Sequence, residues 1–218
     1  MSIVTLVRHG QANTGATDED SYDNLSKLGR QQAAWLGDYL AGNAHGVRRI
    51  IAGSMRRQQQ TASYIATALG LSVAMDRRLN EINYFALTES LQARTNRQPP
   101  TCREEFLEHL PMVMASWEAG EIESPDETFA EYQQRVQDIL AEAELSDGTM
   151  LVTSGGVIGM AMRNVLGLNT DSFAHVLLQI NNASTHRYQI EHGARRLMTF
   201  NATPHLDAHD RVETRTYV

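Results

Sequence analysis

Short apolar runs alternate with longer amphipathic stretches along most of the 218 residues. The short runs are β-branched and buried in character, and they predict strands at 2–7, 47–52, near 71–75 and at 149–153. The stretches between them have helical spacing and predict helices at about 27–41, 55–69 and 156–166. Strands that alternate with helices predict an α/β fold, a three-layer α/β/α sandwich with a mostly parallel sheet.

Local signals mark the ends of these elements. Ser26 is placed to cap the helix that follows it, and Gly70 is placed to end the helix before it. The turn-rich segment 10–24 predicts a loop. A hairpin of 184–191 and 195–200 is expected around His192 and Gly193, followed by a polar surface tail over 202–218.

The middle of the chain has a different pattern. Residues 86–145 have helical spacing without an intervening strand, and two helices fit, at about 101–119 and at about 127–144 starting near Asp126. We expect this segment to be a helical insert within a single domain spanning 1–218, because that length suits one core.

Composition and charge narrow the functional classes. A net charge of −7 opposes non-specific binding of nucleic acid or an anionic membrane, so an anionic ligand must be held by a local cluster of cations. Cys102 is the single cysteine, so a disulfide framework within the chain is excluded. The sequence has no run of about 18 apolar residues and no apparent signal peptide, which predicts no membrane span and a cytoplasmic location.

The candidate catalytic and binding residues follow the ends of the predicted strands. Arg8, His9 and Gly10 follow the first strand, Arg56 and Arg57 open the helix after the second, and Glu81 follows the third. Ligands of parallel α/β sheets bind outside the carboxyl ends of the strands. Arginines at a helix start are unfavourable for the helix itself, which makes sense if an anion binds there.

Together these residue types suit a phosphate monoester. Guanidinium groups match the oxygens of a phosphoryl group, and a neutral imidazole can attack phosphorus to form phosphohistidine. Glu81 can serve as a general acid if apolar neighbours favour its protonated form.

The motifs in order resemble the histidine phosphatase superfamily, specifically its phosphoglycerate mutase-like group. The resemblance covers nearly the whole chain and includes the following segments: Arg8-His9-Gly10, Leu25-Ser26-x-x-Gly29-x-x-Gln32-Ala33, Arg57-x-x-Gln60-Thr61-Ala62, Leu79-x-Glu81, Tyr132 through Val136, Asn182-Ala183-Ser184 and Asn201 through Leu206.

The resemblance implies a role for each matching residue. His9 would take the phosphoryl group, Arg8 and Arg57 would neutralise its oxygens, and Glu81 would protonate the leaving oxygen and then activate water. The resemblance implies no metal and no cofactor, because the arginines supply the positive charge. A phosphorylated small molecule or phosphoprotein would be the substrate.

The chain departs from this family at Ser154. The family usually places a second site histidine where this chain reads Val152-Thr153-Ser154-Gly155-Gly156. Ser154 either donates one neutral hydrogen bond to phosphate or only caps the following helix. Losing a charged donor would slow the enzyme, so three accounts stay open: a slow phosphatase, a protein that binds phosphorylated ligands without turnover, or an exchange engineered into the chain.

Two further residues are substrate-binding candidates. Gln11 stands where many relatives have Glu, which favours a dianion, and Asn13 could donate to phosphate. A hydrolase is preferred over a mutase because residues 86–125 of the insert offer few cations, namely Arg94, Arg97 and Arg103. The insert is polar and mixed, without an aromatic cage, so the substrate and the oligomeric state are not indicated.

Overall fold

The computed structural model describes residues 2–13, 19–43 and 46–217. Within them the sheet has six strands in the order β3-β2-β4-β1-β5-β6. The four strands from β3 to β1 pair in parallel, and β5 and β6 pair antiparallel at the other side. The strands are β1 (Ser2–Arg8), β2 (Arg49–Ala52), β3 (Val73–Met75), β4 (Thr149–Thr153), β5 (Thr185–Glu191) and β6 (Ala194–Ala202).

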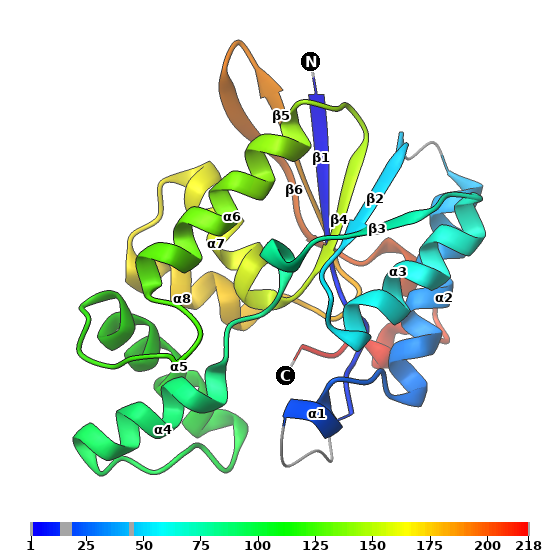
Figure 1. Cartoon of the computed structure of the whole chain (residues 1–218). Coiled ribbons are helices and arrows are strands. Elements are labelled where there is room, and N and C mark those ends of the chain that lie inside the picture. The colour runs from blue at the N-terminus through cyan, green and yellow to red at the C-terminus, as the bar shows by residue number, and fades with distance from the viewer. Residues whose placement is uncertain (1, 14–18, 44–45, 218) are drawn as a thin grey trace.

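Helices cover both faces of this sheet (Figure 1). The α-helices are α1 (Glu19–Tyr22), α2 (Lys27–Gly42), α3 (Arg56–Leu69), α4 (Tyr84–Thr95), α5 (Arg103–Glu118), α6 (Phe129–Glu144), α7 (Gly155–Leu166) and α8 (Thr170–Gln179). Three short 3₁₀ helices are η1 (Arg77–Leu79), η2 (Pro204–Leu206) and η3 (Val212–Thr214). The predicted α/β sandwich with a mostly parallel sheet is confirmed.

Successive side chains of a strand point to opposite faces of the sheet, so the strands contribute to two separate apolar layers. Val7 packs with α2 and α3 on one face of the sheet, whereas Val4 and Leu6 pack with α6, α7 and α8 on the other. Burying apolar side chains on both faces is what allows a parallel sheet to form at the centre of a domain.

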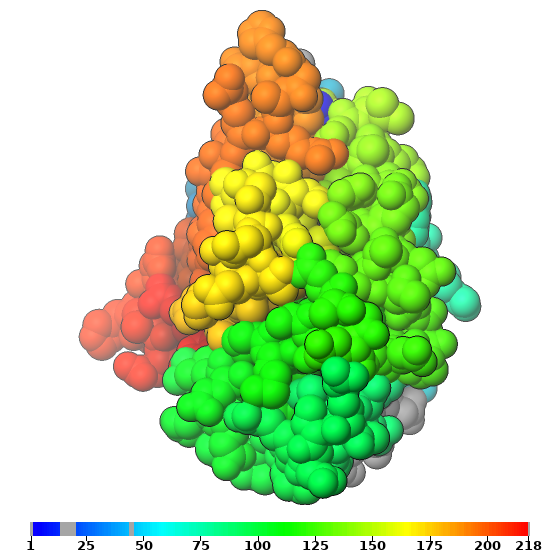
Figure 2. Space-filling view, turned by 90° about the vertical axis from the view of Figure 1, so that its left-hand side faces the viewer, coloured from blue at the N-terminus to red at the C-terminus, as the bar shows by residue number. Residues whose placement is uncertain are grey.

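The segment 86–145 contains more than the two helices that its pattern indicated. Helix α4 was missed, as was α8 further along. The last helix of the segment, α6, begins with Thr128 and not Asp126 as its cap, since the Thr128 side chain accepts a hydrogen bond from the backbone of Glu131. Its buried side chains belong to the apolar layer on the sheet. In Figure 2, α4 and α5 (green) form one end of the molecule, and the hairpin of β5 and β6 (orange) forms the other.

The prediction of a surface tail over 202–218 is wrong for the parts of this segment that pack against the domain, and residue 218 lies outside the described residues. His205 and Leu206 are buried, and the amide of Gln32 on α2 donates to the Thr214 carbonyl at 2.7 Å. The Asn182 backbone N–H also donates to the Thr216 carbonyl at 2.7 Å. Part of the polar composition of this segment is therefore used in hydrogen bonds to the rest of the fold, whereas residues 207–210 are exposed.

Burial keeps His205 neutral and makes the fold sensitive to acid. Burial, and then the charge of Arg211, lower the pKa of His205 to about 4. Below its ordinary pKa of 6.5 the unfolded chain binds a proton at this imidazole that the native chain does not. The free energy of unfolding therefore falls as the pH drops from about 6.5 towards 4.

We expect His205→Leu to reduce this loss of stability at acidic pH. Neither ring nitrogen of His205 has a hydrogen-bond partner among the described residues, so an apolar side chain leaves nothing unpaired. Urea unfolding at pH 7.5 and at pH 4.5 gives the free energy of unfolding at each pH. Between the two, the variant should lose about 2 kcal/mol less than the wild type. His209→Leu, at an exposed position nearby, should keep the wild-type decrease; equal decreases in both variants would contradict the assignment.

Candidate active site

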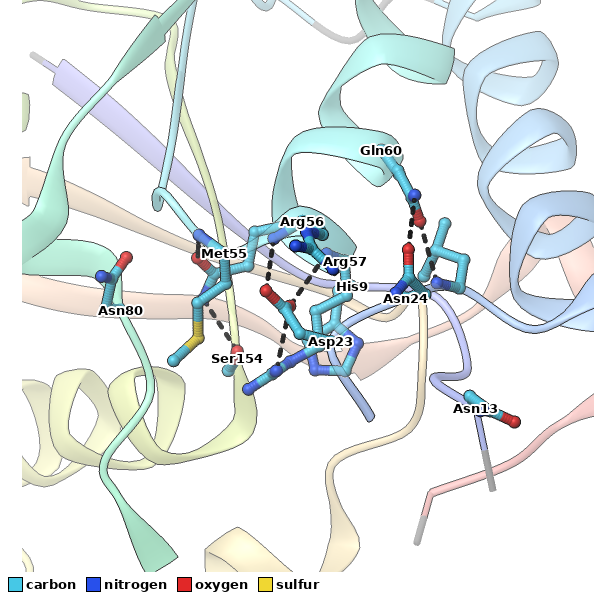
Figure 3. Close-up of polar contacts among 12 residues, drawn as sticks. His9, Asn13, Asp23, Asn24, Met55, Arg56, Arg57, Gln60, Asn80 and Ser154 are labelled. Carbon is cyan, nitrogen blue, oxygen red and sulfur yellow. Dashed lines mark hydrogen bonds and ion pairs between the residues drawn. The ribbon is translucent and has the colours of Figure 1, made fainter. Parts of the chain in front are cut away.

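The carboxyl ends of β1 and β4 lie side by side, because the two strands pair in parallel with Arg8 opposite Thr153. Strand β2 pairs with β4 in the same direction, so the start of α3 reaches the same edge. Figure 3 shows that the side chains brought together there include His9, Asp23, Arg57 and Ser154. The topology thus assembles a site from segments far apart in the sequence.

His9 is 2% exposed and rigidly held. Its backbone N–H donates to the Thr153 carbonyl at 2.9 Å, and its Nδ1 lies 2.7 Å from the carbonyl oxygen of Gly10. Burial, and then the charges of Arg57 and Arg8, lower the pKa of His9 well below its ordinary value. A neutral ring bonded to a carbonyl carries its proton on Nδ1, which leaves the lone pair on Nε2.

Gly10 is required by the approach of α2. A Cβ at position 10 would lie 2.3 Å from the backbone oxygen of Gly29. This close approach fixes the chain directly after His9 against the helix, and any larger residue would displace one of the two segments.

Arg8 is a buried cation without a carboxylate partner among the described residues. Its Nη1 donates to the carbonyl oxygens of Ile180 and Tyr217, the latter at 2.5 Å, and its Nε has no partner. Burial lowers the pKa of the guanidinium, with Glu81 acting in the opposite direction. A buried charge that lacks a counter-ion favours binding of an anion beside it.

Arg57 is anchored by Asp23, which the sequence argument missed. The Asp23 carboxylate lies 3.1 Å from Nη1 of Arg57 and accepts the backbone N–H groups of Arg56 and Arg57 at 2.8 and 3.1 Å. An anion does occupy the start of α3, as the two arginines suggested, but this anion belongs to the chain. The guanidinium also lies over the Tyr22 ring, 5.0 Å from its centroid.

Glu81 is fixed by two backbone N–H groups. Its Oε1 accepts from Ile82 at 3.0 Å, and its Oε2 accepts from Gly156 at the start of α7 at 2.9 Å. A Cβ at position 156 would lie 2.1 Å from Oε1, so this glycine makes room for the carboxylate. The buried Tyr132 hydroxyl, which has no hydrogen-bond partner among the described residues, would lie 3.2 Å from the same Cβ.

Ser154 is fully buried and is the cap residue of α7, yet its side chain makes no capping hydrogen bond. The interpretation that its hydroxyl merely caps the helix is therefore wrong. Its Oγ accepts a hydrogen bond from the side-chain amide of Gln58 at 2.8 Å, and the same amide donates to the Leu79 carbonyl at 3.0 Å. The hydroxyl proton of Ser154 remains available for a further acceptor.

Gln11 and Asn13 lie away from this cluster. The Gln11 side chain accepts a hydrogen bond from the Ser26 hydroxyl at 2.7 Å, next to the start of α2. Asn13 is exposed, donates to the Ser21 carbonyl at 3.2 Å, and lies apart from His9 in Figure 3. Their proposed contacts with substrate stay predictions that this arrangement does not favour.

A pocket of about 360 Å³ opens over His9. The described residues that line it are Arg8, His9, Tyr22, Arg57, Glu81, Ile82, Tyr84, Phe85, Thr88, Pro99, Pro100, Phe106, Leu110, Gly155, Gly156 and Leu177. The insert was expected to be polar and mixed, yet it contributes Pro99, Pro100, Phe106 and Leu110 to this lining and no charged side chain among the described residues.

Among residues 2–13, 19–43 and 46–217, no group of three or more His, Cys, Asp or Glu side chains is arranged to hold a metal ion. No helix in that part of the chain is long and apolar enough to cross a bilayer.

Two phosphatases of known structure have a similar fold. The phosphoserine phosphatase of Entamoeba histolytica, solved as a histidine-to-alanine mutant with phosphoserine, has a TM-score of 0.68 at 20% identity, covering 94% of this chain and all of the other. A mycobacterial glucosyl-3-phosphoglycerate phosphatase has a TM-score of 0.67 at 22% identity, covering 93% of this chain and all of the other. These likenesses establish the fold class.

The sequence establishes the family. Residues 4–203 match the histidine phosphatase superfamily, branch 1, and the chain belongs to that family. A probable phosphoglycerate mutase GpmB of Enterobacter sp. (strain 638) is 31% identical over 191 residues, which cover 84% of this chain and 83% of that protein. The family and these relatives support an enzyme of the phosphatase or mutase type.

Proposed function

We propose that this protein hydrolyses phosphate monoesters through a phosphohistidine at His9. The observation that carries the proposal is the neutral imidazole, bonded through Nδ1 to the Gly10 carbonyl at 2.7 Å and lining a pocket that Arg8 and Arg57 also line. Such a ring has an available lone pair on Nε2 at neutral pH, and the two guanidinium groups attract the phosphoryl oxygens.

The reaction takes two steps. Nε2 of His9 attacks phosphorus, the ester P–O bond breaks, and Glu81 gives its proton to the leaving oxygen. Glu81 then removes a proton from water, whose oxygen attacks the phosphohistidine, so the N–P bond breaks and phosphate leaves. Arg8 and Arg57 stabilise the charge on the transferring group in both steps.

A second candidate function rests on Ser154. Because this serine replaces the family's second site histidine, the pocket has one fewer group that can carry positive charge. A protein that binds a phosphorylated ligand without turning it over is the alternative. A phosphoglycerate mutase-type phosphotransferase is less favoured, because Arg8 and Arg57 are the only cations among the described lining residues.

Trapping the intermediate tests the proposal. The protein is mixed with a ³²P-labelled phosphate monoester, quenched in alkali, and analysed for label on His9, since phosphohistidine survives alkali and is lost in acid. Label on His9 that decays with release of phosphate supports the hydrolase. Retention of bound inorganic phosphate without any label or turnover overturns it in favour of the binding protein.

Restoring the histidine should accelerate the reaction. We expect Ser154→His to raise kcat by at least about tenfold, because a charged donor returns beside the phosphoryl group. Initial rates with a generic aryl phosphate measure this change. Ser154→Asn serves as the control, since it supplies a donor without charge and should give a smaller gain. An unchanged or lower rate in a folded Ser154→His protein would place position 154 outside the phosphate contacts.

The cytoplasmic location and a phosphorylated small molecule or phosphoprotein as substrate remain parts of this proposal. The E. histolytica phosphatase has been solved in complex with phosphoserine and with 3-phosphoglyceric acid, which makes small phosphorylated metabolites suitable first substrates here.

A further inference from the structure

Most of the pocket beyond the phosphate-binding end is apolar. Its wall comes from the start of α4, the loop before α5, α5 itself and α8, through the side chains of Ile82, Tyr84, Phe85, Phe106, Leu110 and Leu177. Pro99 and Pro100 complete it, and Thr88 contributes one hydroxyl. A wall of this composition gains binding free energy from apolar groups in proportion to the area that it removes from water.

The hydroxyl group of Tyr84, an aromatic residue of the pocket wall, is already engaged in a contact within the protein. The Tyr84 hydroxyl lies 2.8 Å from Nδ1 of His109, and the Tyr84 ring packs edge-on against Phe106 with centroids 5.5 Å apart. His109 is 1% exposed, and burial lowers its pKa, so it stays neutral. Tyr84 and Phe106 therefore offer a ligand ring surface and not a free hydroxyl or charge.

The three arginines of residues 86–125 make their contacts away from the pocket. Arg94 lies 3.5 Å from Glu121, Arg97 lies 3.5 Å from Glu108, and Arg103 lies over the Tyr217 ring. None of the three lines the pocket. A second anionic group on the substrate would therefore meet no further cation among the described lining residues.

We infer that the substrates of this site are phosphate monoesters of apolar alcohols, alkyl or aryl, that carry no second anionic group. The inference rests on the proposed phosphatase function and goes beyond it by naming the part of the substrate that the pocket selects. Selection has two sources: burial of the apolar group against α4, α5 and α8, and the absence of a counter-ion for a carboxylate.

A homologous series tests the first source. The kcat/KM values of n-alkyl phosphates from ethyl to hexyl are compared, because leaving-group basicity is nearly constant along this series and pocket contact is what changes. We expect a rise of about fourfold for each added methylene until the pocket is filled. Phosphoserine and 3-phosphoglycerate should be poorer than hexyl phosphate by at least about tenfold.

A matched pair of variants tests the second source. Phe85 lines the pocket and is 44% exposed, so Phe85→Arg places a cation in the wall without disturbing the core. We expect this variant to show a smaller increase in kcat/KM along the alkyl series. It should also raise the kcat/KM for 3-phosphoglycerate relative to that for hexyl phosphate at least about tenfold. Met198→Arg is the control, because Met198 is 46% exposed on β6 and lies outside the pocket.

The outcomes separate this inference from the proposed function. Turnover with no dependence on chain length, or a preference for 3-phosphoglycerate over hexyl phosphate, overturns the inference and leaves the phosphatase standing. Equal effects of Phe85→Arg and Met198→Arg also overturn it. A chain that turns over none of these esters overturns the phosphatase itself, and the inference with it.

Discussion

Replacing His9 by alanine is expected to lower kcat for a generic aryl phosphate at least about 10⁴-fold, because the nucleophile is lost. The remaining donors cannot form a covalent intermediate, so the two-step route is closed. Steady-state assays of purified His9→Ala beside wild type measure the loss, and the same samples should show no alkali-stable label.

The fold and the anion site should survive this substitution. Arg8 and Arg57 are held by Ile180, Tyr217 and Asp23, and none of these contacts involves the imidazole. Thermal unfolding in the presence of phosphate should therefore still show stabilisation by the ligand. His175→Ala, at an exposed position on α8, is the matched control and should retain full activity. More than about one hundredth of wild-type activity in His9→Ala would contradict the covalent mechanism.

Replacing Glu81 by glutamine should have the second-largest effect. Removing a general acid lowers rates by about 10²–10⁴-fold. The loss should appear in full with alkyl phosphates, whose leaving oxygens need a proton. It should be much smaller for the first step with p-nitrophenyl phosphate, whose leaving group departs as an anion, and burst kinetics can isolate that step.

The amide nearly preserves the shape of the carboxylate, which makes this a test of proton transfer. Its one oxygen can still accept from Ile82 or Gly156, though not from both in the present geometry. Glu104→Gln on the exposed face of α5 provides the control and should not change the reaction rate with either substrate. An equal loss with both esters would assign Glu81 to binding and not to protonation.

The architecture could be predicted because its signals are local. The runs at 2–7 and 149–153 are short and β-branched, and β1 and β4 form there. Ser26 and Gly70 were expected to bound helices, and the structure shows the Ser26 side chain capping α2 and Gly70 in the left-handed region after α3. Helix α4 was missed, because its apolar side chains do not concentrate on one face and Pro99 and Pro100 interrupt the pattern after it.

The candidate site could be predicted only where it follows strand ends. Arg8, His9, Arg57 and Glu81 meet at one edge of the sheet because parallel strands end together. Asp23 gave no signal, since an aspartate in a turn-rich loop is ordinary and its contact with Arg57 depends on how the loop folds over α3. The same is true of Gln58, whose partner Ser154 is 96 positions away.

The apolar pocket could not be predicted because its wall is distributed. Phe85, Phe106, Leu110 and Leu177 come from three helices, of which α8 is far from the other two in the sequence. The packing of α4 and α8 against α5 brings these residues to a common surface. A polar sequence can thus present an apolar surface inward while its charged side chains pair with one another outside.

The carbonyl of Tyr217 that receives Arg8 ties the start of the chain to a segment made more than two hundred positions later. During synthesis on a ribosome, the sheet can be largely formed while this guanidinium still lacks one of its two backbone anchors. Docking of the segment that carries Thr216 and Tyr217, which also bonds Asn182, is thus needed to complete the backbone contacts of this guanidinium.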